Sequence, residues 1–434
     1  MQNATRNVVE QPLQVLVAKK LYAPEEIPGP VAVVLEGATI RDIWRGMDAS
    51  AVRRHLSEHM PEQHAYTPAH ILDLAAYSLA PGYIDLHTHG FGGYDVTTGT
   101  REEVEAMARL LPRTGVTAFF PTVATLDRVN TVEQVKRITG AIADQGCTSA
   151  AEMLGLRLEG PFISKAKKGA QYEQGIRPPD TTELKALALM GHGCIRIIDY
   201  APEEDANNDF LATVVRLGIL ACIGHTAATY EQALRAIDGG ARHSTHLFNA
   251  MSGLNHRDPG VAGALLTDSR ASVEIIADGV HMHPAIVKLA LAARDWHDIA
   301  LITDAISAAG LPEGDYEFVG RKISVTNGAV RLEDGALAGS ILTLDRAVRN
   351  IVAFTDMSWS QAIAMATQIP ARIANIAQRK GSITPGADAD LIALDEQGMV
   401  QCTWTHGQLA YQPVASSNGQ RNIAAPLLRE GASS

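Results

Sequence analysis

The sequence predicts a (β/α)8 barrel, or TIM barrel, joined to a small β-sandwich domain that the two ends of the chain build together. Eight β-like runs alternate with helix-like segments over roughly 250 residues, which is the usual length of such a barrel. Short apolar runs separated by turn residues lie on either side of it, and these are typical of small antiparallel strands. At 434 residues, the chain also exceeds the usual size of a single domain.

We expect the small domain to comprise residues 1–78 and 382–434, and the barrel to comprise residues 79–381. The strands of the small domain are predicted at Leu13–Val17, Val31–Leu35, Ile40–Trp44, Ala389–Asp395, Val400–Trp404 and Gln408–Tyr411. Residues 47–70 change in composition and predict an insertion with a surface helix over Ala49–Met60. Past Gln412 the chain is polar and rich in Ala and Ser, so we expect poor order there.

Within the barrel, strands and helices are predicted from runs of apolar residues and from helical spacing, respectively. The strands are Tyr83–His89, Val116–Val123, Met153–Glu159, Ile195–Tyr200, Ile219–His225, Arg242–His246, Val273–Ala277 and Ala300–Asp304. The clearest helices are Arg101–Arg113, Val129–Ala143, Asp205–Leu217, Tyr230–Asp238 and Ala285–Arg294.

Composition and charge exclude several classes of protein. A hydrophobic content of 46% with 20% charged residues is ordinary for a soluble protein. A net charge of −11 without a Lys/Arg cluster argues against a nucleic-acid partner. The four cysteines form no CxxC pair, so we expect reduced thiols. No signal peptide and no apolar run of membrane-spanning length is present, which predicts a cytoplasmic protein without a membrane partner.

Residues of metal-ligand type lie at the ends of the predicted barrel strands. Alternate residues of a strand share one face, so His87 and His89 point the same way. Glu159, His225, His246 and Asp304 end the third, fifth, sixth and eighth strands. Barrel active sites are built at these carboxyl ends. The pattern predicts a divalent-metal site, with zinc the first expectation and iron, cobalt or manganese as alternatives.

Nine stretches in colinear order between residues 79 and 395 resemble the N-acetylglucosamine-6-phosphate deacetylase family of the amidohydrolase superfamily. They are PGYIDLHTHG, GVTAFFPTVAT, GLRLEGPFISKAKKGAQ, GHTAATYEQA, STHLFNAMSGLNHRDPG, IIADGVHMHP, LITDAISAAG, LAGSILTLDRAVRN and KGSITPGADADLIALD. LEGPF, HLFNAM and LAGSxLT distinguish this family from the wider superfamily. The resemblance implies metal-dependent hydrolysis of the acetamide of N-acetylglucosamine 6-phosphate or a close N-acetylhexosamine phosphate.

Metal and catalytic roles carry over by the same resemblance. It implies that Glu159, His225 and His246 bind the principal ion. It implies further that His87 and His89 hold a second ion, with Glu159 bridging and Asp304 nearby. Asp304 is similar in position to the family's catalytic acid/base; its other interpretation is a metal ligand only.

The resemblance also implies a small-molecule amino sugar phosphate as the partner and a homodimer. Arg257 resembles an arginine that binds phosphate across the dimer interface, where its planar fork suits the phosphate oxygens. The other implied substrate contacts are Ala170, Gln171, Asn249, Ala250, His281, Leu337, Ala338 and Gly339.

Gln171 departs from the family pattern, which commonly has a histidine against the acetyl carbonyl. Glutamine donates a hydrogen bond but cannot transfer a proton. Two alternatives therefore stay open: another amidohydrolase, such as a deaminase or a deacetylase of other N-acyl compounds, and a non-catalytic metal- or sugar-binding barrel. Arg257 and His281 oppose the first alternative. Asp304 opposes the second, because a module that only binds needs no carboxylate beside the metal.

Overall fold

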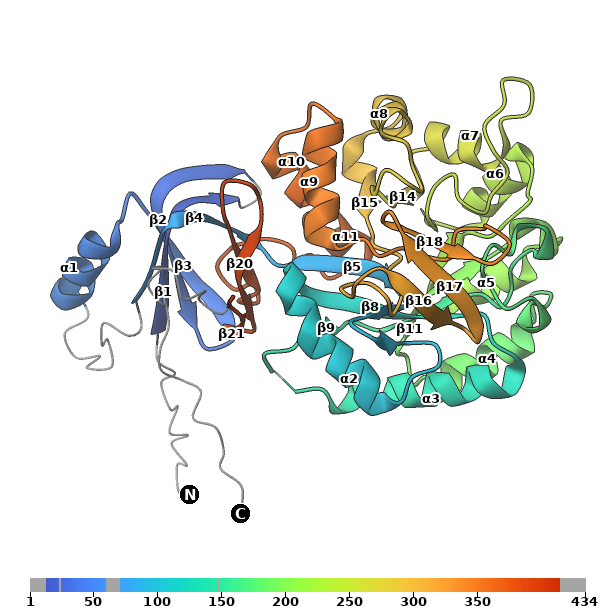
Figure 1. Ribbon diagram of the computed structural model, residues 1–434, viewed down its shortest axis with the longest axis horizontal. Coiled ribbons are helices and arrows are strands. Elements are labelled where there is room, and N and C mark those ends of the chain that lie inside the picture. Colours follow the sequence, from blue (N-terminus) through green and yellow to red (C-terminus); the bar gives the residue numbers. More distant parts are fainter. Residues whose placement is uncertain (1–12, 23–24, 60–70, 147, 414–434) are drawn as a thin grey trace, which may run out of the picture.

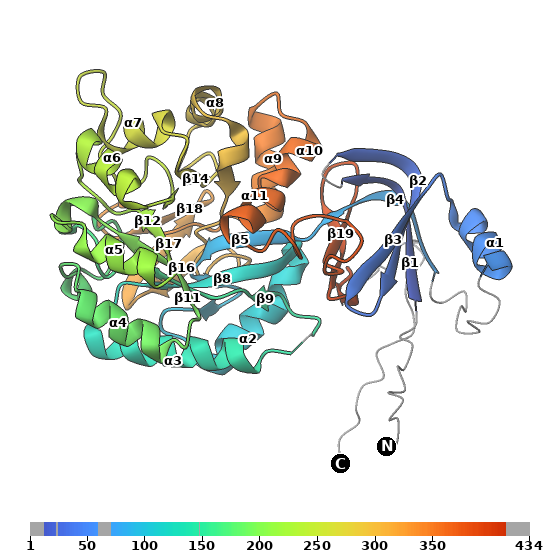
Figure 2. The same ribbon diagram turned by 180° about the vertical axis from the view of Figure 1, so that it is seen from behind.

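The computed structural model describes residues 13–22, 25–59, 71–146 and 148–413. Figure 1 shows a small β domain beside a larger barrel, and the chain passes between the two twice. It enters the barrel through β5 and returns to the small domain after α11, as the view from behind also shows (Figure 2). Cys147, part of the expected insertion at 60–70 and the segment after Pro413 lie outside the described residues.

The barrel strands are parallel and follow the chain in order around the barrel. They are β5 (Tyr83–Thr88), β8 (Val116–Ala124), β10 (Leu156–Glu159), β11 (Ile195–Tyr200), β12 (Leu220–Ile223), β13 (His243–Ser244), β14 (Ser272–Ile275) and β15 (Ile299–Leu301). The last strand meets the first through a parallel bridge between Thr88 and Ala305. The Asp304 backbone N–H also donates to the His87 carbonyl at 2.9 Å. The predicted eight-stranded barrel is therefore confirmed.

Helices surround these strands, as Figures 1 and 2 show from opposite sides. They are α2 (Arg101–Leu110), α3 (Arg128–Asp144), α4 (Thr181–Met190), α5 (Asp209–Arg216), α6 (Tyr230–Gly239), α7 (Gly260–Thr267), α8 (Pro284–Ala293), α9 (Leu344–Phe354), α10 (Trp359–Ala364) and α11 (Gln368–Ile373). Thr100 and Thr229 begin α2 and α6 with capping boxes, which satisfy the free N–H groups of the first turn. Within the described part of the chain, no helix is both long and apolar enough to cross a membrane.

Several predicted elements are shorter than the sequence pattern suggests, and the structure gives the reason for two of them. The third strand breaks into β9 (Glu152–Met153) and β10, because Gly155 between them has a φ of 155°. The helix predicted from Asp205 begins only at Asp209. There the Asp205 carboxylate accepts hydrogen bonds from the backbone of residues 210 and 211, and Asn208 is left-handed with a φ of 57°. Side-chain capping therefore delays the helix start beyond what apolar spacing predicts.

The small domain is built on one seven-stranded mixed sheet in the order β21-β20-β19-β4-β1-β2-β3. Its strands are β1 (Leu13–Tyr22), β2 (Glu26–Glu36), β3 (Thr39–Arg45), β4 (Ile71–Pro81), β19 (Leu391–Leu394), β20 (Val400–Thr405) and β21 (Gln408–Tyr411). The sheet folds over on itself, since Val33 and Trp404 from distant strands share one core. Helix α1 (Ala49–His59) covers its other face through Val52 and Leu56.

A third sheet lies over the barrel in Figure 1, and the sequence patterns above do not predict it. It consists of β16 (Gly314–Phe318), β17 (Arg321–Thr326) and β18 (Ala329–Leu332), joined by two-residue turns. A two-stranded ribbon, β6 (Gly90–Phe91) with β7 (Tyr94–Asp95), follows the first barrel strand. Short 3-10 turns complete the described elements at Leu111–Thr114, Lys165–Lys167, Glu173–Gly175, Pro202–Glu204 and Trp296–Asp298.

A charge network connects the barrel to the small domain. Lys380 contacts Glu152 at 2.8 Å and Asp388 at 2.9 Å, and Arg379 pairs with the same two carboxylates. Burial would raise the pKa of Glu152. The hydrogen bond from Arg379 and the charge of Lys380 outweigh that effect and lower the pKa to about 2.

Glu152 is expected to stabilise the fold above pH 4.5, its ordinary pKa, and to lose that contribution as the pH falls from 4.5 towards about 2. In Glu152→Gln, the urea midpoint should drop clearly at pH 7, and the difference from the parent should shrink towards pH 3. Glu133→Gln, which removes an exposed ion pair, is the control and should change little at either pH. An equal loss at both pH values for Glu152→Gln would contradict the assigned charge effect.

Candidate active site

The Glu159 carboxylate lies at the centre of the barrel mouth with four imidazoles around it. Its Oε1 atom is 3.0 Å from Nε2 of His225, 3.1 Å from Nε2 of His246 and 3.5 Å from Nε2 of His87. Its Oε2 atom is 2.9 Å from Nε2 of His89. All five side chains are buried. The fold therefore brings together the strand-end residues that the sequence singles out.

Asp304 completes this group from the segment that follows the last strand, β15. Its Oδ1 atom is 3.3 Å from Nε2 of His89 and 3.5 Å from Nε2 of His87. Asp304 also lines the cavity above the histidines, so its carboxylate faces both the cluster and the space that a substrate would enter. Of the strand-end residues, it is the carboxylate best placed to exchange protons with a bound molecule.

Hydrogen bonds fix which histidine nitrogens are free. The Nδ1 atom of His89 is 3.0 Å from the Thr122 carbonyl, and Nδ1 of His225 is 2.9 Å from the Lys167 carbonyl. A carbonyl only accepts, so each Nδ1 carries the proton and each Nε2 presents a lone pair. These lone pairs face the Glu159 oxygens, which also carry lone pairs, and such a donor set fits a divalent cation.

Two groups of three ligands share Glu159. One consists of His87, His89 and Glu159, the other of Glu159, His225 and His246, and in each group the ligand atoms lie within 4.8 Å of one another. The residues present thus fit one ion or a pair bridged by a carboxylate.

The electrostatics of the cluster favour positive charge. Burial and Arg157 oppose protonation of His87, yet the nearby carboxylates prevail and raise its pKa to about 10. Burial likewise opposes protonation of His89, but Glu159 and Asp304 raise its pKa to about 9. The histidines in turn hold the pKa of Glu159 well below its usual range against the effect of burial. Protons and a divalent ion would compete for the same lone pairs.

Three residues of the cluster lie in strained backbone turns. His225, His246 and Asp304 have φ values of 48°, 27° and 49°, in the left-handed region that non-glycine residues rarely adopt. Each follows a short strand, so the chain turns sharply at the barrel mouth and directs the side chain inward. Such conformations cost on the order of 1–3 kcal/mol each and cluster at functional sites.

A second charged layer lies directly beneath the cluster. The Arg157 guanidinium is fully buried and donates to Asp199 at 3.1 Å and to Glu274. Glu274 also contacts Nδ1 of His87 at 3.4 Å and Nε2 of His243 at 2.9 Å. Sequence reasoning missed this layer. A signal was present, since Arg157 precedes Glu159 by two positions on an otherwise apolar strand and so points to the same interior.

Replacing Arg157 with methionine is expected to destabilise the fold by about 3–5 kcal/mol, because two buried carboxylates would lose their cation. The measurement is the free energy of unfolding in urea. Arg128→Met is the matched control; it removes an exposed arginine that pairs with Asp180 and Glu183, and it should cost at most about 1 kcal/mol. Equal losses for the two variants would contradict the buried network.

A cavity of about 140 Å³ opens above the cluster. Its walls come from the strand-end residues and from loops on the same face of the barrel: His89, Glu159, Gly169, Ala170, Gln171, His225, His246, Asn249, Ala250, His281, Asp304, Phe318, Leu337 and Gly339. Among the residues expected to contact substrate, Ala338 is buried beside this cavity without lining it, and Arg257 does not line it. Phe318 and Gly169 line it without having been expected.

Gln171 is held by two hydrogen bonds that orient its amide. Its Oε1 atom accepts from the Thr125 backbone N–H at 2.6 Å, and its Nε2 atom donates to Oε2 of Glu159 at 2.5 Å. The NH2 group therefore faces the ligand cluster. From that position it can donate a hydrogen bond but cannot act as an acid.

Two of the expected substrate contacts, His281 and the phosphate-binding Arg257, lie in different settings. His281 is close to Asp278, with Nδ1 to Oδ2 at 2.7 Å, and this carboxylate raises the pKa of His281 although burial opposes protonation. Arg257 lies in an exposed loop, where its guanidinium contacts the His256 ring at 2.8 Å. Within one chain, His281 is therefore the group of the cavity best suited to an anion outside the ligand cluster.

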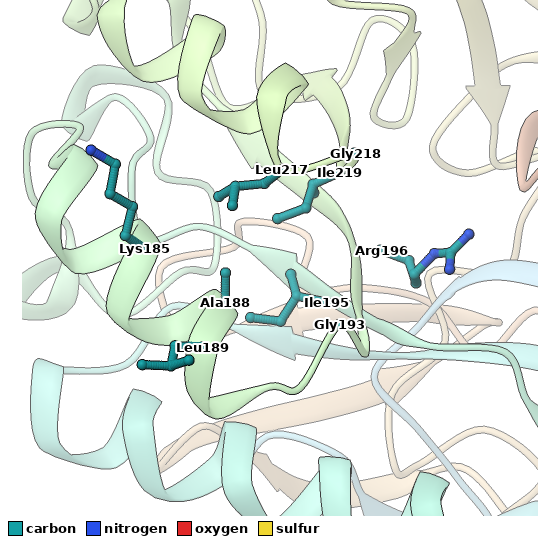
Figure 3. Close-up of a pocket in the computed structure, with 9 residues that line it drawn as sticks. All are labelled: Lys185, Ala188, Leu189, Gly193, Ile195, Arg196, Leu217, Gly218 and Ile219. Atoms are coloured by element: carbon teal, nitrogen blue, oxygen red, sulfur yellow. The ribbon is translucent and has the colours of Figure 1, made fainter.

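Figure 3 shows the residues around a larger hollow of about 490 Å³. It lies at the end of the barrel opposite the ligand cluster, because its lining includes residues at the amino ends of strands. It is bounded by residues at the amino ends of β11 and β12, including Ile195 and Ile219, and by the exposed side chain of Leu189. Lys185 and Arg196 are its charged groups. None of its lining residues is a carboxylate, histidine or cysteine, so the smaller cavity is the one with groups suited to metal binding and proton transfer.

Comparisons with known proteins agree with this geometry. The model of the amidohydrolase family matches residues 78–426. The N-acetylglucosamine-6-phosphate deacetylase of Bacillus subtilis is 35% identical over 382 residues, covering 88% of this chain and 96% of the relative. The N-acetylgalactosamine-6-phosphate deacetylase of Escherichia coli O157:H7 is 38% identical over 343 residues, covering 79% of this chain and 90% of the relative.

Solved structures that are similar to this chain include further N-acetylglucosamine-6-phosphate deacetylases. An N-acetyl-D-glucosamine-6-phosphate deacetylase mutant from Mycobacterium smegmatis, in complex with N-acetyl-D-glucosamine-6-phosphate, aligns with a TM-score of 0.82 at 29% identity. That alignment covers 92% of this chain and 99% of the other. The deacetylase from Thermotoga maritima aligns with a TM-score of 0.77 at 29% identity, covering 93% of this chain and 99% of the other.

Proposed function

The chain belongs to the amidohydrolase family and, within it, to the N-acetylglucosamine-6-phosphate deacetylases, and from this premise we propose its reaction. It hydrolyses the acetamide of N-acetyl-D-glucosamine 6-phosphate, or of a close N-acetylhexosamine phosphate, to acetate and the amino sugar phosphate. The observation that carries this proposal is the Glu159 carboxylate among four imidazoles, with Asp304 beside them at the floor of a small cavity.

Metal binding is assigned to the two ligand groups that share Glu159. His225 and His246 with Glu159 would hold the principal ion, and His87 and His89 with Glu159 would hold a second. Zinc is the first candidate, with iron, cobalt and manganese as alternatives. An ion held there would supply Lewis acidity and would lower the pKa of a water molecule towards 7.

Asp304 is the proton carrier of the reaction. It accepts a proton from the attacking water and passes it to the amine nitrogen, because an amine anion is too basic to leave unprotonated. Its position between the histidines and the cavity supports both steps. Gln171 contributes an N–H donor towards the same space and holds Glu159 in place.

The substrate is held by its sugar and its phosphate. Asn249 and Ala250, with the backbone of residues 337–339 and Ala170, bound the sugar. His281, which lines the cavity and is oriented by its contact with Asp278, supplies one phosphate contact. Arg257 supplies a second phosphate contact, to the substrate bound by the partner subunit of a homodimer. Its exposed position outside the cavity of its own chain supports this role.

We further assign the enzyme to the cytoplasm, where the free thiols of Cys194, Cys222 and Cys402 would stay reduced. The domain division is proposed at 1–78 with 382–434 for the small domain and at 79–381 for the barrel. No nucleic-acid or membrane partner is proposed, in keeping with the net charge of −11.

A second candidate function is hydrolysis of a neutral N-acyl compound by the same cluster. It is favoured by one observation: neither arginine nor lysine lines the cavity of the described chain. The two candidate functions differ in whether the substrate must carry a phosphate group.

The test compares acetate release from N-acetylglucosamine 6-phosphate, its galactosamine epimer and unphosphorylated N-acetylglucosamine, with the metal content measured on the same sample. We expect turnover of a phosphorylated sugar. Arg257→Ala should raise KM for that sugar and leave the unphosphorylated one unaffected. Arg196→Ala, at the other end of the barrel, is the control and should change neither. Turnover of the neutral sugar alone would favour the second candidate.

A further inference from the structure

Phe318 is the large aromatic residue that closes the cavity beside the ligand cluster. It ends β16, is only 4% exposed and lines the cavity. Its ring centre lies 5.7 Å from that of His89, and the two ring planes meet at 69°. The other apolar cavity residues are small, such as Ala170 and Ala250, or lie half-buried, as Leu337 does.

The hairpin that carries Phe318 is anchored from behind. Phe318 shares an apolar cluster with Ile306, Ile323 and Val330, and this cluster fixes the hairpin against the barrel. The turn after it forces Val319 into a left-handed conformation with a φ of 48°, which is unfavourable for a β-branched residue. The Val319 side chain nevertheless packs against the same cluster. The strained turn at Val319 therefore positions the aromatic ring of Phe318 beside the site.

The geometry restricts where an acyl group can go. A carbonyl carbon beside Glu159 and the histidines carries two other substituents, the amide nitrogen and the acyl chain. The nitrogen bears the sugar and must point towards the open part of the cavity. The acyl chain is apolar and must meet the wall, and next to His89 that wall is the ring of Phe318.

We propose that Phe318 is the residue that limits the substrate to short acyl groups, with N-acetyl preferred over N-propionyl and N-butyryl. This inference rests on the proposed deacetylase function and adds the chemical class of the acyl chain. Phe318 acts by occupying space: its ring meets the acetyl methyl and clashes with a longer chain. One extra methylene in such a pocket changes the specificity constant by roughly 10–200-fold.

The experiment measures kcat/KM for the N-acetyl, N-propionyl and N-butyryl forms of the preferred amino sugar phosphate. In Phe318→Ala, the ratio of propionyl to acetyl activity should rise by about tenfold or more, with a smaller rise in Phe318→Leu. Ile323→Ala is the matched control; it removes a buried residue of the same cluster that does not line the cavity. In this control the ratio should stay within about twofold of the parent.

The outcomes separate two kinds of failure. An unchanged ratio in Phe318→Ala, or an equal change in Ile323→Ala, would overturn the acyl-limiting role while the deacetylase function stands. If the parent releases no acetate from any amino sugar phosphate, the proposed function fails, and the acyl assignment fails with it. Circular dichroism and the thermal midpoint of each variant establish that the hairpin change has not unfolded the barrel.

Discussion

Replacing Asp304 with asparagine is expected to reduce kcat by about 10²–10⁴-fold while the metal content stays that of the parent. Asparagine keeps the size of the side chain and one oxygen. It cannot accept a proton from water or return one to the amine. The backbone contact that closes the barrel at this point, from the Asp304 N–H to the His87 carbonyl, is retained.

The measurements are acetate release under saturating substrate and metal analysis of the same protein after dialysis. Asp205→Asn is a matched control, because Asp205 is also 8% exposed but caps α5 and does not line the cavity. It should change stability and leave kcat near that of the parent. Loss of metal in Asp304→Asn would instead make Asp304 mainly a ligand, and full activity would remove it from the proposed mechanism.

Replacing Glu159 with alanine is expected to remove all bound metal and to lower activity by more than about 10³-fold. Glu159 belongs to both ligand groups, so its loss opens both sites together. His89→Asn affects only one group and should leave the principal site loaded. Metal content per subunit therefore separates the two variants independently of activity.

Glu159→Gln is the companion variant to Glu159→Ala. It keeps the shape of the side chain and removes only its charge, so it tests whether the charge is what binds the metal. Since the four imidazoles face this carboxylate, the neutral amide should also lose metal, although the fold is retained. A Glu159→Ala protein that still binds one ion with parent affinity would contradict the shared-carboxylate arrangement. The thermal midpoint with and without added zinc gives a second readout of binding.

Much of the fold follows from local patterns. Short apolar runs predict the barrel strands, and Ile195–Tyr200 matches the observed β11 residue for residue. The ends of elements are less well predicted because side-chain caps decide them, as Asp205 does for α5. The hairpins β16 to β18 escaped prediction because their short, mixed strands owe their burial to the cluster around Phe318.

The sequence by itself determined the barrel and the six strand-end side chains from His87 to Asp304, because strand periodicity and strand-end position are properties of short segments. Only the tertiary structure decided which distant groups meet. Glu274 contacts Arg157 across 117 positions of sequence, and Phe318 reaches His89 from a separate sheet. The tertiary structure also places Arg257 outside the cavity of its own chain. The physical reason is that these contacts depend on barrel closure and on the paths of loops, which the packing of the whole chain sets and no local pattern encodes.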